Sequence, residues 1–376
     1  MRLFWIALTG LMLSVPAAQA QEIDNSAPFT SAIVCGQCHK DIHAAWKENR
    51  HSRAATTPTF LRSLEEAEET GTAGTRRLCL MCHAPTVTLT GDLAMQKTIS
   101  KESVTCDFCH SMVEALPGDD PPFKLEVGLE SNIKRGPYKD ASDANHGVAF
   151  SPIHVSALLC ATCHEFETES GVAILSTYTE YLEGPYARRN VPCQGCHMPI
   201  IMAHVVDPKV QLDPKRFLNL HRMPGGHSVG QLQRALDLKW GEIGWKSGEL
   251  QVQVAILNVG AGHRVPTGMP TRRLLLEVEA RTAAGKAYTK ETVFQKQVVD
   301  ARGRLIKKDG EMFLRAHHIR QDNRIRPGEK RQQRFSFLVP SGVIRLTARL
   351  IYESSPFGAA GEIERVPFAS IETTVR

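Results

Sequence analysis

Five copies of one short motif constrain this chain more than any other feature of its sequence. Each copy reads Cys-x-x-Cys-His, and the copies begin at Cys35, Cys79, Cys106, Cys160 and Cys193. We number them as the first to fifth block in chain order. Together they contain all ten cysteines, and a histidine directly follows every second cysteine. Any fold of this chain must therefore serve five identical sets of two thiols and one imidazole.

The motif is the attachment signature of haem c. Its two cysteines lie about one helical turn apart, so both sulfurs can reach the vinyl groups on one porphyrin edge. The adjacent histidine offers a nitrogen to the iron. Zinc knuckles and disulfides are the alternatives, but neither needs a histidine after every second cysteine. We predict five covalently attached haem c groups. The attachment residues are Cys35, Cys38, Cys79, Cys82, Cys106, Cys109, Cys160, Cys163, Cys193 and Cys196, and the proximal ligands are His39, His83, His110, His164 and His197.

The start of the chain has the pattern of a secretory signal peptide. A basic Met1-Arg2 precedes an apolar run to about Val15, and Ala18-Gln19-Ala20 gives a cleavage site near Ala20. A transmembrane anchor is the alternative, but the apolar run is short for one, and no later run is long enough to span a membrane. We expect a periplasmic or extracellular protein that does not span the membrane.

The net charge of the chain indicates little about its partners. The formal net charge is +5, and no basic face is interleaved with aromatic residues, so we expect no nucleic-acid partner. Some of the arginines are expected to pair with haem propionates.

Cysteine usage and hydrophobic periodicity both change near residue 230. Residues 21–230 give each predicted haem roughly 40 residues of chain, which is too little for a separate protein core. The haems themselves would form the core, wrapped by short helices and loops. We predict an α-plus-all-β protein: a signal peptide (1–20), a mostly α/loop pentahaem cytochrome domain (21–230) and an antiparallel β-sandwich (231–376).

Local signals place several elements in the first domain. Thr57-Pro58 predicts a helix start and Gly71 its end. Its apolar stripe would contain Phe60, Leu61, Leu64 and Ala67. We also expect a helix from Asp41 to about Ala55, a loop over 115–122 and a short helix or turn over 177–186.

Period-2 alternation indicates strands in the second domain, over 250–256 and 344–350 and around Phe335 and Phe337. Residues 229–240 are expected as the first strand, with a helix as the alternative. Turns are predicted at Ala284-Gly285, Arg302-Gly303, Asp309-Gly310 and Pro327-Gly328.

Ten histidines outside the blocks are available for the second axial position of each iron. Bis-histidine ligation saturates iron and favours electron transfer, whereas an empty position leaves room for a substrate. Our candidate distal ligands are His51, His146, His154, His204 and His227, followed by His221 and His263. A polar surface or turn residue is the alternative for each of them. His43, His317 and His318 are expected at the surface or in local hydrogen bonds.

The loop from Gly262 to Gly268 allows two interpretations. In the first, its glycines and proline serve only to connect two strands. Alternatively, it carries His263 or Arg264 onto a haem edge and docks the two domains.

The chain resembles the multihaem cytochrome c family that includes the tetrahaem electron acceptor of hydroxylamine oxidoreductase. The resemblance rests on the five blocks with their flanking residues, such as Trp46 and His51 after the first block, and on the Gly262–Gly268 run. It covers about residues 30 to 350. It implies close-packed, mostly bis-histidine haems in a periplasmic electron carrier, with His51 as a distal ligand. This chain departs from that pattern in having five blocks rather than four.

We therefore expect an electron carrier with redox-protein partners and no catalytic residues. One alternative is an oxidoreductase with an open haem that acts on a small nitrogen or sulfur compound, although no block has the lysine-substituted form Cys-x-x-Cys-Lys. The other is a subunit that docks or self-assembles through the β domain into an extracellular filament or complex.

Overall fold

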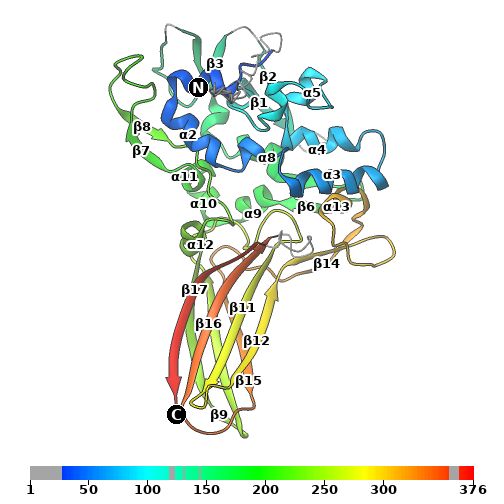
Figure 1. The fold of residues 1–376 in the computed structure, drawn as a ribbon, viewed down its shortest axis with the longest axis vertical. Coiled ribbons are helices and arrows are strands. Elements are labelled where there is room, and N and C mark those ends of the chain that lie inside the picture. Colours follow the sequence, from blue (N-terminus) through cyan, green and yellow to red (C-terminus); the bar gives the residue numbers. More distant parts are fainter. Residues whose placement is uncertain (1–27, 118–122, 130–131, 144, 355–363) are drawn as a thin grey trace, which may run out of the picture.

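The computed structural model describes residues 28–117, 123–129, 132–143, 145–354 and 364–376. The predicted signal peptide lies outside these residues. A region of short helices and small sheets stands above a region of long antiparallel strands (Figure 1). Within the described ranges, no helix has the length and apolar character needed to cross a membrane.

Short helices dominate the first region. Each block forms the last turn of a helix, so its cysteines and histidine are presented together. The helices are α1 (Ala32–Cys38), α2 (Lys40–Glu48), η1 (His51–Arg53), α3 (Pro58–Thr70), α4 (Thr75–His83), α5 (Thr86–Thr90), α6 (Thr98–Lys101), α7 (Cys106–His110), η2 (Pro152–Val155), α8 (Leu158–His164), α9 (Thr177–Glu183), α10 (Pro185–Arg188) and α11 (Gln194–His197).

The capping signals located α3 correctly. The Thr57 side chain accepts a hydrogen bond from the Phe60 amide, and Gly71 is the C-cap residue. Leu61, however, is 49% exposed and lies outside the buried stripe. The helix expected from Asp41 to Ala55 is shorter than predicted, because α2 ends at Glu48 and a separate 3₁₀ turn follows.

Four small two-stranded sheets complete the first region. They are β1 (Met112–Pro117) with β2 (Phe123–Val127), β3 (Ile133–Gly136) with β4 (Gly147–Phe150), β5 (Glu165–Glu167) with β6 (Ala173–Ser176), and β7 (Ile200–Ala203) with β8 (Arg216–Asn219). Only β3 and β4 pair in parallel among these. The loop predicted over 115–122 is wrong at its start, because residues 115–117 pair with β2. Residues 118–122 lie outside the described part.

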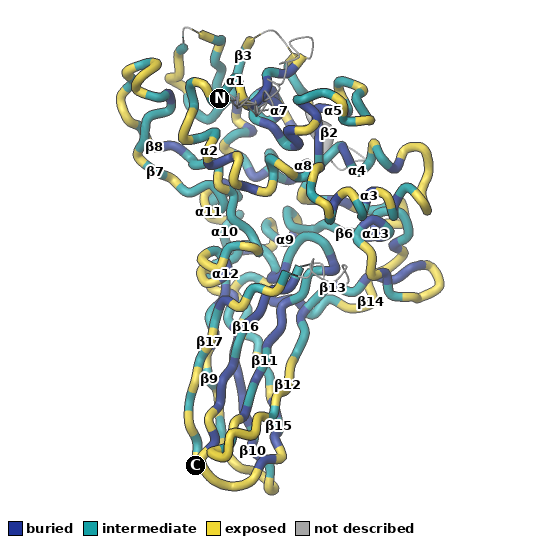
Figure 2. Tube along the Cα trace, in the orientation of Figure 1, coloured by how far each residue is buried: buried dark blue, intermediate teal, exposed yellow. Residues whose placement is uncertain are grey.

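Two antiparallel sheets build the second region. One has the order β15 (Lys330–Phe337), β10 (Glu249–Asn258), β9 (Leu236–Lys246). The other has the order β12 (Ala287–Phe294), β11 (Arg273–Thr282), β16 (Ile344–Ser354), β17 (Glu364–Val375). Side chains of both sheets, such as Val254 of β10 and Leu276 of β11, share one buried cluster. The buried positions run along the lengths of these strands (Figure 2).

Two local predictions in this region are corrected. Residues Val229–Ala235 form helix α12, because Ser228 caps it by accepting from the Gln231 amide, and the first strand begins only at Leu236. Asp309-Gly310 is not a turn but the start of helix α13 (Asp309–Arg315). The other three predicted turn glycines do adopt positive φ: Gly285, Gly303 and Gly328.

The two regions are joined by direct packing. Helix α13 packs on α3, and a buried cluster combines Phe166 and Ile174 of β5 and β6 with Val298 and Met312. Val298 belongs to β13 (Lys296–Val299), which pairs with β14 (His318–Asp322). The second region is therefore positioned to contribute side chains to the first.

Candidate functional site

A cavity of about 1750 Å³ runs through the first region and is lined by all five blocks. A pocket for one small ligand typically measures about 300–1,000 Å³. Residues of the second region, including His263, Arg272 and Tyr352, also line the cavity. It therefore offers space for several large groups at the junction of the two regions.

The block histidines are oriented as metal ligands are. A ligating histidine usually binds a carbonyl or carboxylate through its second nitrogen, which fixes the ring and leaves the first nitrogen for the metal. Four block histidines do this through Nδ1, leaving Nε2 available. The pairs are His39 with Val205 O (2.9 Å), His83 with Ala54 O (2.9 Å), His110 with Arg135 O (2.6 Å) and His197 with Pro224 O (2.7 Å).

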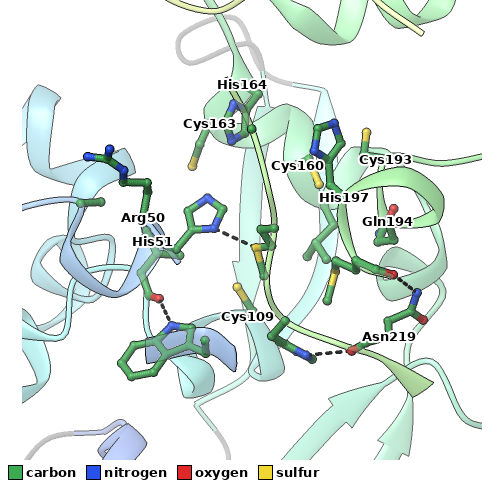
Figure 3. Close-up of a pocket in the computed structure, with 18 of the residues that line it drawn as sticks. Arg50, His51, Cys109, Cys160, Cys163, His164, Cys193, Gln194, His197 and Asn219 are labelled. Atoms are coloured by element: carbon green, nitrogen blue, oxygen red, sulfur yellow. Dashed lines mark hydrogen bonds between the residues drawn. The ribbon is translucent and has the colours of Figure 1, made fainter. Parts of the chain in front are cut away.

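Four block histidines each have a second histidine at one characteristic spacing. With a metal–imidazole bond of about 2.0–2.1 Å, two rings on opposite sides of one iron have centroids roughly 6 Å apart. The observed centroid distances are 6.3 Å for His39–His146, 6.2 Å for His164–His51, 6.1 Å for His110–His221 and 6.3 Å for His197–His263. The residues present therefore fit haem iron. Figure 3 shows His51 beside His164.

The four partner histidines are anchored through their own Nδ1 atoms. His146 is bonded to Gly147 O (3.0 Å), His221 to Asn219 O (3.0 Å) and His263 to Arg264 O (2.9 Å). His51 Nδ1 lies 2.8 Å from Met223 Sδ (Figure 3). Each of these rings keeps Nε2 available.

Burial keeps the deepest of these rings neutral. It lowers the pKa of His164 to about 3 and that of His221 to about 4, with neighbouring histidines adding to the effect. Burial also lowers the pKa of His51 and His263. A neutral imidazole is the form that binds a metal.

Three sequence candidates do not face a block histidine at this spacing. His154 stacks beside His110 at 5.4 Å, and its Nε2 atom contacts Cys109 O at 3.0 Å. His204 contacts Asp213 O through Nδ1 at 2.7 Å. His227 Nδ1 lies 2.5 Å from Glu364 Oε2. His221 and His263, which the sequence ranked lower, do have a block histidine at this spacing.

The second block differs from the other four. No histidine ring pairs with His83, although every histidine of the chain lies in a described segment. Phe60 stacks on the His83 imidazole instead, with centroids 4.2 Å apart and an interplanar angle of 24°. Because the two rings stack face to face, Phe60 covers a face of the His83 imidazole and does not occupy the space in front of Nε2. The position opposite His83 thus has no imidazole.

Cysteine side chains of different blocks lie close to one another. The neighbouring pairs are Cys35 with Cys106, Cys82 with Cys163, and Cys160 with Cys193. Cys109 is also a neighbour of Cys163 and Cys160. The first block therefore neighbours the third, and the fourth neighbours the second, third and fifth.

The cysteines differ in their electrostatic environments. All ten, each in a described segment, are unbridged. Burial raises the pKa of Cys79 to about 11 and that of Cys109 to about 12, whereas neighbouring side chains lower the pKa of Cys163 and Cys193. Across the described segments, no three His, Cys, Asp or Glu side chains converge as a metal-ion site.

Comparison with known proteins agrees with this geometry. Residues 34–111 match the family model described as cytochrome c554 and c-prime. The structure is similar to a penta-heme cytochrome c552 from Thermochromatium tepidum, with a TM-score of 0.71, 21% identity, and coverage of 93% of this chain and 99% of that chain. A structural-genomics target, SoR45, aligns with a TM-score of only 0.18 and carries no argument. No curated protein sequence matches the chain.

The blocks, the cavity and these similarities place the chain beside the multihaem c-type cytochromes, a class whose haem c groups are attached covalently. Within that class, the chain shares its fold over nearly its whole length with the penta-heme cytochrome c552.

Proposed function

We propose that this protein is a periplasmic or extracellular pentahaem c-type cytochrome that relays electrons between redox partners. The observation that carries the proposal is that four block histidines each lie about 6 Å from a second, anchored histidine. Bound haem c supplies one-electron chemistry at its iron, and a protein controls it through axial ligands, burial and hydrogen bonds.

We assign the chain's residues as follows. The paired cysteines of each block hold a porphyrin edge, and the block histidine is the proximal ligand. With haem bound, His146, His221, His51 and His263 would be the distal ligands opposite His39, His110, His164 and His197. His154, His204 and His227 would not be distal ligands, because none of them has a block histidine at that spacing.

The proximity of cysteines in different blocks supports a relay. Porphyrin edges attached at neighbouring side chains lie close to one another, and such pairs link the five blocks without a gap. We infer that the β region is a sandwich, since its two sheets share one buried cluster. The chain division near residue 230 agrees with the start of α12 at Val229.

The test is haem content and spin state together. A pyridine-haemochrome assay against protein mass should give five haems per chain, and low-temperature EPR should show mostly low-spin ferric iron. Two or fewer haems, or mainly high-spin iron, would contradict the proposal. Boiling in denaturant should not release the haems, because thioether attachment is covalent.

A second candidate function is an oxidoreductase, and the His83 geometry favours it. With no imidazole opposite His83, the second block's iron would keep a position for a small nitrogen or sulfur compound. Asp309 lines the same cavity beside Arg272. Burial raises the pKa of Asp309, and a carboxyl with a raised pKa is the kind of group that can act as a general acid toward a bound substrate.

Carbon monoxide separates the two candidates. It binds ferrous haem only where the sixth position is open or labile. The reduced protein should bind one carbon monoxide per chain, at the second block. If it also reduces hydroxylamine or nitrite with many turnovers, it is an enzyme; binding without turnover supports the carrier alone.

The redox partners are identified only by class. The resemblance to the electron acceptor of hydroxylamine oxidoreductase suggests an enzyme of small nitrogen compounds as donor. Docking or assembly through the β region has one supporting feature: Trp245, Leu338 and Val343 are exposed at the ends of β9, β15 and β16. Replacing Trp245 and Leu338 by serine should then abolish assemblies seen by electron microscopy, while leaving haem content unchanged.

A further inference from the structure

A buried ion pair crosses the junction between the two regions. Glu180 of α9 and Arg324, which follows β14, are 3% and 4% exposed, and Arg324 Nη2 lies 2.7 Å from Glu180 Oε1. Removing two charges from water costs about as much as their attraction returns, so such a pair is weak evidence of a stabilising role. A buried ion pair more often serves to fix the conformation of the segments that it connects, which here are the segments bound by Glu180 and Arg324.

Glu180 holds the loop that carries His263. Its Oε2 atom accepts hydrogen bonds from the Arg264 amide (3.2 Å) and from Thr267 Oγ1 (2.8 Å). Its Oε1 atom accepts from Ser176 Oγ (2.8 Å) in addition to Arg324. The two carboxylate oxygens thus tie the loop directly after His263 to the helix that leads toward the fifth block.

Arg324 holds the same loop from the other side. Its Nη1 donates to Pro266 O at 3.2 Å, and its Nε and Nη2 donate to Asp322 at 2.8 and 2.7 Å. Burial opposes the charge on Arg324, but Asp322 and Glu180 outweigh it and raise the pKa of this guanidinium. Asn258 Nδ2 donates to His263 O at 3.0 Å. The backbone at His263 and in the residues that follow it is therefore held by Glu180, Arg324 and Asn258.

We propose that Glu180 and Arg324 are positioning residues that hold His263 on the iron of the fifth block, and so couple the state of that haem to the docking of the β region. The inference rests on the assignment of His263 as the distal ligand opposite His197. It adds that the imidazole stays in place because Glu180 of the first region and Arg324 of the second region together hold its loop. Loosening this hold would make the ligand labile without removing it.

The experiment compares Glu180→Gln with Glu353→Gln in the full-length, haem-loaded protein. Glu353 is an equally buried carboxylate (3% exposed) that contacts Arg273 and Arg365 within the β region. Glu180→Gln should let reduced protein bind one carbon monoxide per chain more than wild type, and raise the fifth haem's midpoint potential. Glu353→Gln should change neither, although both variants lower the thermal midpoint.

A gentler pair of variants guards against a folding failure. Thr267→Val removes the hydroxyl that donates to Glu180, whereas Thr267→Ser keeps it. A hydrogen bond to a charged group contributes about 1.5–3 kcal/mol, so its loss should accelerate carbon monoxide binding at the fifth haem roughly tenfold or more. Thr267→Ser should bind at the wild-type rate. The positioning role would be contradicted if Thr267→Val and Thr267→Ser bound carbon monoxide at equal rates. It would also be contradicted if Glu180→Gln and Glu353→Gln bound equal amounts of carbon monoxide.

His263→Ala separates this inference from the assignment beneath it. It should give a fifth haem that is fully high-spin, and added imidazole should restore the low-spin form. If His263→Ala leaves the spectrum unchanged, the ligand assignment fails. If it acts as expected but Glu180→Gln behaves like Glu353→Gln, only the positioning role fails.

Discussion

His51 lies in a short turn that contacts the histidines of two different blocks. It lies in the 3₁₀ turn after α2, far along the chain from the fourth block, yet its ring is 6.2 Å from that of His164. Three residues later, the carbonyl oxygen of Ala54 accepts a hydrogen bond from Nδ1 of His83. One short turn therefore contacts the histidines of two different blocks.

Replacing His51 by alanine should convert one haem from low-spin to high-spin, because the iron opposite His164 loses an axial ligand. EPR should show about one additional high-spin ferric iron per chain. His227→Ala is the matched control, since His227 pairs with Glu364 and faces no block histidine. A high-spin signal of equal size in both variants would show that the His51 pairing is wrong.

Lys296 gives a pH prediction at the same scale. Its ammonium is 3% exposed and donates to Ala173 O, Ile174 O and Ser176 Oγ. Burial lowers the pKa of Lys296 to about 8 from 10.5. Between these two values the unfolded chain binds a proton that the folded chain does not, so this group's contribution to stability rises with pH.

The rise should total on the order of 3 kcal/mol between pH 8 and 10.5, at about 1.4 kcal/mol per pKa unit. Urea unfolding followed by circular dichroism at several pH values measures it. Lys296→Met should lack this component of the pH dependence. A wild-type curve parallel to that of the variant would show that Lys296 titrates normally.

At the scale of elements, helix α13 determines how α3 lies over the second block. A Cβ atom on Gly310 would come within 2.2 Å of Ser63 O, so the two helices approach through backbone. Helix α3 also carries Phe60, which stacks on His83. The close approach at Gly310 is thus one of the contacts through which the β region reaches the environment of the second block.

Gly310→Ala should lower the free energy of unfolding by about 1–3 kcal/mol, because the added methyl group overpacks a backbone contact. It should also alter the spectrum of the second haem. Gly230→Ala in α12 is the control: nothing lies within 4 Å of its Cβ, and alanine favours a helix by up to about 1 kcal/mol. Thermal unfolding measures both, and equal midpoints would contradict the close approach.

Sequence reasoning succeeded where the signal was local. The caps at Thr57 and Gly71 located α3, and alternation located β10, β15 and β16. It failed where tertiary contacts decide. Asp309-Gly310 has turn composition but starts a helix that packs on α3. The facing of His221 toward His110 and of His263 toward His197 depends on how distant segments meet, which no spacing in the chain encodes.

For the whole molecule, the fourth block is the centre of the arrangement. Its cysteines are neighbours of those of the second, third and fifth blocks, whereas the cysteine neighbour found for the first block belongs to the third. This pattern predicts a branched array in which electron transfer between branches passes through the fourth block, Cys160–His164.

Replacing Cys160 and Cys163 by serine should remove one haem and isolate the branches. Electron exchange between the first and fifth haems should then become dependent on protein concentration, because it has to proceed between molecules. Stopped-flow reduction at several concentrations measures this. The same change at Cys193 and Cys196 also removes one haem, but exchange among the other four should stay concentration-independent. Concentration-independent exchange in the fourth-block variant would contradict the branched array.

The placement of His263 has a consequence for biogenesis. Ribosomes make the chain from its amino end, so His51 already exists when the fourth block emerges, whereas the ring opposite His197 is encoded much later. On the proposed assignment of His263, the fifth centre would gain its second axial ligand only after the carboxy-terminal half has been made and folded. A chain that stops before His263 would leave that ligand position open.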